Sequence, residues 1–118
     1  MFDLWMRLLH AVPGSVLWLL ESNPNATDNL LREALARGIS KERIVFAPKL
    51  AIEAHLARLN LADLFLDTLP VNAHTTASEA LWTGLPVLTC VGEAFIGRVA
   101  ASLLMAIGLP ELLSLIHI

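Results

Sequence analysis

The sequence predicts an α/β fold, a Rossmann-like parallel sheet with flanking helices, and three observations lead to this prediction. Short apolar runs alternate with longer amphipathic segments, which is the pattern of parallel βαβ units. The chain is 56% hydrophobic and only 16% charged, as expected when strands are covered on both faces. A polar loop and a helix start also follow the apolar run at residues 64–66, where open α/β sheets bind ligands.

The first half of the chain contains two expected helices and two expected strands. Residues 1–12 carry apolar side chains at helical spacing, and residues 27–37 do the same before Gly38 ends the helix. Residues 15–20 and 44–46 are short apolar runs next to turn residues, and we expect each to form a buried strand.

The second half continues the alternation and contains the most informative segment, in which a polar loop leads into a short helix that ends at Gly84. Ile96 is expected on the inward face of the last helix, and Trp5, Trp18 and Trp82 lie in apolar runs that predict core packing. The expected elements are a helix at 52–59, a strand at 64–66, a helix from 74–76 to Gly84, a strand at 87–90 and a helix at 94–107.

We expect one domain, a partial nucleotide-sugar-binding lobe over residues 1–112. The chain begins with a helix that no strand precedes, which suggests a truncated Rossmann-like unit. Residues 113–118 break the pattern and match one reading frame of a transposase-end sequencing adapter. We interpret residues 113–118 as an adapter-derived scar and exclude them from functional reasoning.

Composition excludes several classes of function. The net charge of −3 argues against nucleic-acid binding, which needs a basic surface. The apolar runs are broken by residues such as His10 and Pro13, so no membrane span is expected. The single cysteine, Cys90, predicts neither a disulfide nor a zinc site and favours a cytoplasmic location.

The candidate site begins at His74, Thr75 and Thr76, which open a helix after a buried strand. Helix N-termini present unpaired N–H groups that bind anions such as phosphate. Glu79 lies one turn further on the same face as Thr75, where it suits a sugar hydroxyl. The simpler alternatives are a helix cap for the threonines and a solvated side chain for Glu79.

Six ordered blocks of this sequence resemble the C-terminal catalytic region of O-linked N-acetylglucosamine transferases and SPINDLY proteins, the tetratricopeptide-fused glycosyltransferases. The resemblance covers nearly the whole chain. The blocks are 13–20 (PGSVLWLL), 43–48 (RIVFAP), 62–68 (ADLFLDT), 72–76 (NAHTT), 80–87 (ALWTGLPV), and the pair 92–93 (GE) with 97–103 (GRVAASL).

This resemblance implies the C-terminal lobe of a GT-B transferase, the lobe that holds the UDP part of a sugar donor. It places His74, Thr75 and Thr76 on the diphosphate-binding turn. It places Glu79 at a ribose-binding position that is usually Asp in the family. The donor acts as substrate, and no metal or other cofactor is expected, because the chain has no Asp-x-Asp motif or metal-binding cluster.

The resemblance also implies contacts to the base. His55 and Arg58, three residues apart on one helix, fall on positions that contact the uracil, although without the family they read as a surface face. Leu50 falls near a backbone contact to the base edge. Animal members carry a ribose-binding lysine at the position of Ile52, and Lys49 lies three residues earlier, so Lys49 joins the candidate residues.

The resulting hypothesis is the UDP-sugar-binding part of a protein O-linked glycosyltransferase that uses UDP-N-acetylglucosamine or a similar donor and protein Ser or Thr acceptors. No catalytic residue is assigned within the chain. We expect the isolated chain to be inactive, because the N-terminal catalytic lobe and the tetratricopeptide repeats are missing. An epimerase-like lobe and a non-enzymatic binding or scaffold remnant are the alternatives, and N-acetylglucosamine, fucose and glucose donors all stay open.

Overall fold

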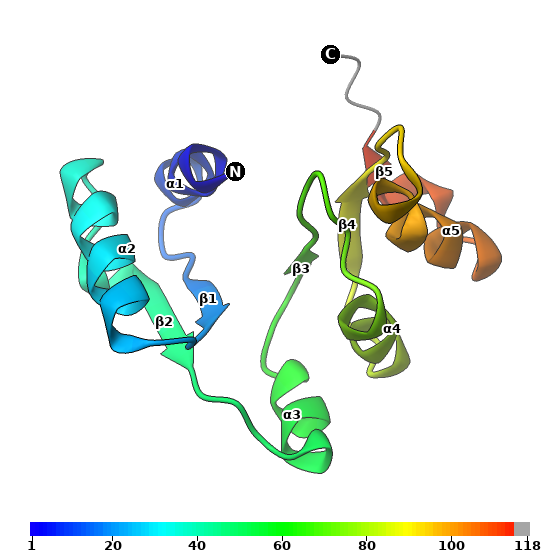
Figure 1. The fold of residues 1–118 in the computed structure, drawn as a ribbon, viewed down its shortest axis with the longest axis horizontal. Helices are drawn as coiled ribbons and strands as arrows, with labels where there is room; N and C mark the ends of the chain where they lie inside the picture. The colour runs from blue at the N-terminus through cyan, green and yellow to red at the C-terminus, as the bar shows by residue number, and fades with distance from the viewer. Residues whose placement is uncertain (115–118) are drawn as a thin grey trace. The chain divides into compact units, whose positions relative to one another are not determined.

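Helices alternate with parallel strands along the chain, as the computed structural model shows for residues 1–114 (Figure 1). This arrangement confirms the predicted α/β class. The chain divides into two compact units, residues 1–50 and the residues from 51 onward, and each is described separately.

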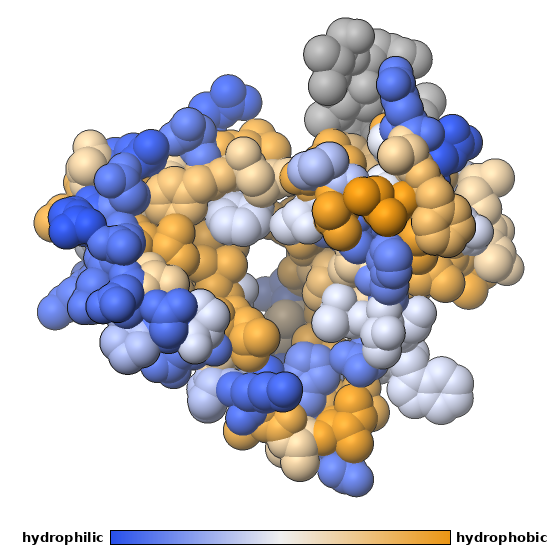
Figure 2. Space-filling model, in the orientation of Figure 1, coloured by the Kyte–Doolittle hydropathy of each residue, from blue (hydrophilic) through white to orange (hydrophobic). Residues whose placement is uncertain are grey.

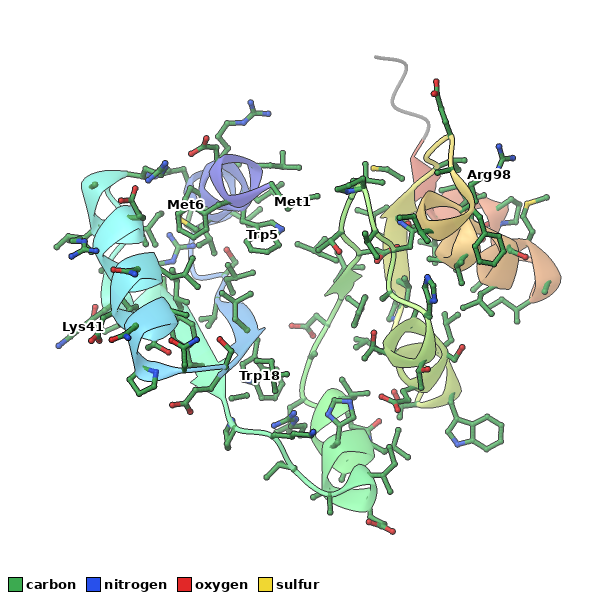
Figure 3. The ribbon with its side chains drawn as sticks, in the orientation of Figure 1. Met1, Trp5, Met6, Trp18, Lys41 and Arg98 are labelled. Carbon is green, nitrogen blue, oxygen red and sulfur yellow. The ribbon has the colours of Figure 1, made fainter. Side chains whose placement is uncertain are left out.

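In the first unit, two helices pack on a parallel pair of strands, in which Leu17 of β1 lies opposite Ile44 of β2. The two helices and β2 supply the core, and Trp5 of the first helix packs against it beside Met6 (Figure 3). The elements are α1 (Phe2–Ala11), β1 (Leu17–Leu20), α2 (Pro24–Ala36), the short 3-10 helix η1 (Lys41–Arg43) and β2 (Ile44–Ala47). The buried core residues are Met6, Leu9, Ala34, Ile39 and Ile44.

Helix α2 begins three residues earlier than the predicted start at residue 27. Asn23 is its N-cap, and its side-chain oxygen accepts a hydrogen bond of 2.8 Å from the Ala26 N–H. Pro24 follows as the first helical residue, where its missing N–H costs nothing. The Asn-Pro pair therefore starts the helix ahead of the predicted position.

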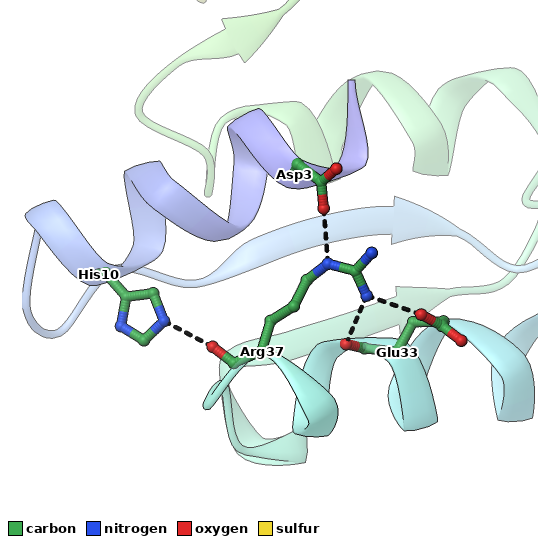
Figure 4. A network of polar contacts seen from close by, with 4 residues as sticks. All are labelled: Asp3, His10, Glu33 and Arg37. Carbon is green, nitrogen blue, oxygen red and sulfur yellow. Dashed lines mark hydrogen bonds and ion pairs between the residues drawn. The ribbon is translucent and has the colours of Figure 1, made fainter.

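A polar network joins α1 to α2 in the first unit (Figure 4). The Arg37 guanidinium donates to Asp3 over 2.6 Å and to the Glu33 carboxylate over 2.7 Å. His10 Nε2 lies 2.8 Å from the Arg37 carbonyl oxygen. The hydrogen bonds from Arg37 to Glu33 and then to Asp3 raise the pKa of its guanidinium, which stays charged at all physiological pH values.

The second unit is built on three parallel strands with β4 in the middle (Figure 1). Its core lies where α4 and β4 meet, around Ala80, Leu85 and Val87. The elements are α3 (Ile52–Leu59), β3 (Phe65–Leu66), α4 (Thr75–Trp82), β4 (Val87–Cys90), η2 (Phe95–Gly97), α5 (Val99–Ala106), η3 (Pro110–Leu112) and β5 (Leu113–Ser114).

The predicted helix at residues 94–107 is in fact a 3-10 turn, η2, followed by the shorter helix α5. Gly97, the last residue of η2, lies at this break. A Cβ added there would lie 3.0 Å from the Pro70 carbonyl oxygen and 3.2 Å from the Gly92 Cα, so the backbone is packed closely on both. Ile96, expected on the inward face, is 43% exposed.

Trp82 is 85% exposed, so the prediction that it packs in the core is wrong. Helix α4 buries Ala77 and Ala80, and Trp82 lies roughly 200° around the helix from Ala80, on the opposite face. Trp18 is also partly exposed, at 36%. Many aliphatic side chains are exposed as well, and orange apolar residues are visible on the molecular surface in Figure 2.

The segment interpreted as a scar, residues 113–118, falls partly within the described residues. Leu113 and Ser114 form β5, which pairs in parallel with Thr89 and Cys90 of β4. Residues 115–118 lie outside the described residues. The origin of this segment, and the single lobe expected over residues 1–112, stay predictions.

Candidate functional site

The first feature of the candidate site is the start of α4, which follows β3 on the carboxyl side of that strand. His74 occupies the N-cap position, and no side chain caps the helix. The side chains of His74, Thr75 and Thr76 are exposed. Because the first N–H groups of a helix have no partner within it, this end presents donors and a partial positive charge to solvent.

The carboxylate of Asp67 accepts hydrogen bonds from both ends of the loop before α4, residues 68–73. One oxygen, Oδ1, accepts hydrogen bonds from the backbone N–H groups of Thr68 at 2.8 Å and Ala73 at 2.7 Å. The other, Oδ2, accepts a hydrogen bond of 2.6 Å from the Thr89 hydroxyl on β4. Sequence analysis did not identify this role, because the contact to Thr89 joins residues far apart in the chain.

The second feature is a hydrogen-bonded row of three side chains that joins α3 to α4. Arg58 Nη2 lies 3.0 Å from Nδ1 of His55, and His55 Nε2 lies 3.1 Å from Oε2 of Glu79. An arginine only donates, so Nδ1 of His55 must accept. The proton of a neutral imidazole then sits on Nε2, which donates to the Glu79 carboxylate.

The row is partly buried and stays accessible to solvent. The side chains of His55 and Glu79 keep 24% and 21% of their exposure. In the tautomer that carries the proton on Nε2, the contact of His55 with Glu79 is a hydrogen bond from the ring N–H to a carboxylate oxygen. The Glu79 carboxylate lies one turn from the start of α4.

The structure thus brings six of the predicted residues together in the second unit: three at the helix start and three in the adjoining row. The remaining two, Lys49 and Leu50, are exposed residues of the first unit, between β2 and α3. Ile52, at the family's lysine position, is the first residue of α3 and is 49% exposed. The ligand contacts of all eight residues stay predictions.

Two searches of the described residues bear on other classes of site. Within residues 1–114, no group of three or more His, Cys, Asp or Glu side chains is placed to hold a metal ion. Among the helices in the same part of the chain, none is long and apolar enough to cross a membrane.

Comparison with known proteins gives one consistent family. The sequence profile described as "Glycosyl transferase family 41" matches residues 1–116. A UDP-N-acetylglucosamine–peptide N-acetylglucosaminyltransferase of Caenorhabditis elegans is 42% identical over 112 residues, which cover 95% of this chain and 10% of the relative. The probable SPINDLY transferase of Arabidopsis thaliana is 31% identical over 117 residues, which cover 95% of this chain and 13% of the relative.

A solved structure agrees with these sequence matches. A mutant of the O-GlcNAc transferase of Thermobaculum terrenum superposes with a TM-score of 0.90 at 39% identity, covering 96% of this chain and 22% of the other. This likeness supports the predicted Rossmann-like part of a GT-B glycosyltransferase. The chain spans only about a tenth of the length of the Caenorhabditis relative.

Proposed function

Because this chain belongs to glycosyl transferase family 41, we propose that it is the nucleotide-sugar-binding part of a protein O-linked glycosyltransferase. The reaction transfers a sugar from UDP-N-acetylglucosamine or a similar donor to Ser or Thr of a protein. The observation that carries the proposal is the uncapped, exposed start of α4 one turn from Glu79.

The helix start suits the diphosphate of the donor. The N–H groups of the first turn and the hydroxyls of Thr75 and Thr76 donate to phosphate oxygens, and the helix dipole favours negative charge. These interactions strengthen as charge grows on the departing UDP, so they stabilise the transition state more than the ground state. In this proposal no metal ion is required to stabilise the negative charge of the diphosphate.

The row on α3 and α4 suits the nucleoside. Glu79 accepts from a ribose hydroxyl with the lone pairs that the His55 contact leaves, because a carboxylate has about four acceptor sites. The neutral imidazole of His55 stacks on the uracil, and Arg58 contacts the base edge. Leu50, for a backbone contact to the base, and Lys49, as a cation for the ribose, lie in the first unit and join the proposal on the family resemblance alone.

We further propose that the chain is inactive by itself and acts within a longer cytoplasmic protein. Relatives such as the Caenorhabditis transferase are far longer than the matched region. In this proposal, the parts of the longer protein outside residues 1–112 position the acceptor protein and supply any general base and the tetratricopeptide repeats. No observation favours the epimerase-like alternative.

Calorimetry of UDP binding to the full-length protein from the parent gene tests this function. We expect wild type to bind UDP, and the double variant Thr75→Ala/Thr76→Ala to bind it at least about tenfold more weakly, since two hydrogen bonds to a charged group are lost. Ser102→Ala, an exposed hydroxyl on α5, is the matched control and should bind normally. Absence of UDP binding by wild type would favour a non-enzymatic remnant.

A further inference from the structure

We propose that Asp67, together with Thr89, is a positioning residue that sets the direction of the N–H groups at the start of α4. This inference rests on the proposed function, because it concerns how the diphosphate contacts are held. The Asp67 side chain bonds the backbone just before the helix and also the central strand of the unit.

The backbone of Asp67 gives the interaction a fixed origin. Asp67 directly follows β3, and its N–H donates to the Leu88 carbonyl of β4 over 2.9 Å. The backbone of Asp67, which carries the carboxylate, is therefore fixed relative to the sheet. Its oxygen Oδ1 then reaches across the loop to the Ala73 N–H at 2.7 Å, and Ala73 directly precedes the N-cap residue His74.

Thr89 holds the other carboxylate oxygen. Its hydroxyl donates to Asp67 Oδ2 over 2.6 Å, and the residue is only 1% exposed within β4. A short hydrogen bond to an ionised acceptor is about twice as strong as a neutral one. With both oxygens bonded, the carboxylate cannot rotate without breaking contacts, so Ala73 is held relative to β4.

The rest of the loop is held independently of Asp67. The Thr68 hydroxyl donates to the Val71 carbonyl over 2.8 Å, and the Asn72 N–H donates to the Ile96 carbonyl over 2.7 Å. Close packing of Gly97 against Pro70 adds a further constraint. Loss of the Asp67 carboxylate should therefore leave the loop folded while it releases the Ala73 amide and the helix start.

A carboxylate close to a diphosphate site is otherwise unfavourable, because like charges repel. Here three donors, two backbone N–H groups and one hydroxyl, compensate its charge. If Asp67 only stabilised the fold, its loss would weaken the binding of all ligands equally. A positioning role predicts an effect on the diphosphate and not on the nucleoside, which the row of Arg58, His55 and Glu79 binds in the proposed function.

The experiment measures dissociation constants for UDP and for uridine in the full-length protein. In Asp67→Ala we expect UDP binding to weaken about tenfold, the loss of one well-directed set of hydrogen bonds, while uridine binding changes less than about twofold. Thr89→Val keeps the side-chain shape and removes only the donor, so a smaller change in the same direction is expected. Asp67→Asn keeps the Oδ1 acceptor, and the Thr89 hydroxyl can turn to accept, so this variant should recover most of the UDP affinity.

Thr68→Val is the matched control, since it removes a hydroxyl contact within the same loop that does not reach the helix. If Asp67→Ala fails to fold, the UDP-to-uridine ratio of Thr89→Val decides the question. Equal weakening of UDP and uridine, or unchanged UDP binding, would overturn the positioning role. Wild type that binds neither ligand would instead refute the proposed function, and the positioning role with it.

Discussion

Arg58 Nη2 lies 3.0 Å from Nδ1 of His55, and this contact determines which ring nitrogen of His55 carries the proton. The guanidinium has no acceptor, so the imidazole must accept at Nδ1 and donate from Nε2 toward Glu79, 3.1 Å away. Arg58 thus sets the direction of both hydrogen bonds in this row. The nucleoside part of the candidate site therefore presents an imidazole ring beside a carboxylate.

The tautomer of His55 can be tested directly. We expect ¹⁵N NMR of the imidazole to show the Nε2–H form in wild type. In Arg58→Met the donor at Nδ1 is gone, so the ring should exchange between its two tautomers. Arg7→Met, on the exposed face of α1, is the control and should leave the His55 signals unchanged. A wild-type spectrum with the proton on Nδ1 would contradict the hydrogen bonds assigned from Arg58 to His55 and from His55 to Glu79.

Glu79 should contribute to nucleoside binding through its charge. We expect Glu79→Gln to weaken uridine binding about tenfold, since hydrogen bonds to a charged acceptor are worth about 1.5–3 kcal/mol. Glu53→Gln, in the exposed first turn of α3, makes the same chemical change away from the row and should bind normally. Competition binding with uridine is the measurement. Equal affinity of Glu79→Gln and wild type would assign Glu79 a purely structural role.

A negative side chain at the start of α4 should improve stability and damage binding at once. Thr75→Asp places a charge at the first helical position, where it should add about 0.3–1 kcal/mol to the free energy of unfolding. The same charge repels the diphosphate, so UDP affinity should fall by at least about tenfold. Urea unfolding and calorimetry give the two values. Thr75→Asn introduces a side chain that is equal in size to aspartate but uncharged, so it separates the effect of charge from that of shape.

The core of the second unit and its surface should respond very differently to truncation. Leu104 has 0% exposure in α5, and Leu104→Ala should lower the free energy of unfolding by about 2–5 kcal/mol. Trp82→Ala removes a larger side chain that is 85% exposed, and its effect should stay within about 0.5 kcal/mol. Chemical denaturation of the full-length protein compares them. A large loss for Trp82→Ala would show that a partner surface covers this tryptophan.

Local patterns predicted most of the elements, and they failed where a distant contact decided the outcome. The bounds of α3 and β4 match the prediction, because turn residues enclose a clear periodic run. The start of α2 was missed at Asn23-Pro24, a cap that is visible in the sequence. The break before α5 was not predictable from periodicity, and at the break the backbone of Gly97 packs closely against Pro70, which lies far away in the chain.

The candidate site divides in the same way. The sequence by itself determined that Thr75 and Thr76 open a helix after a buried strand, because strand, loop and helix signals are local and lie next to one another. Only the tertiary structure decided that His55 bonds Glu79 and that Thr89 bonds Asp67. Those partners lie on separate elements, and their distance depends on how α3 packs on α4 and how β3 pairs with β4, which no local pattern specifies.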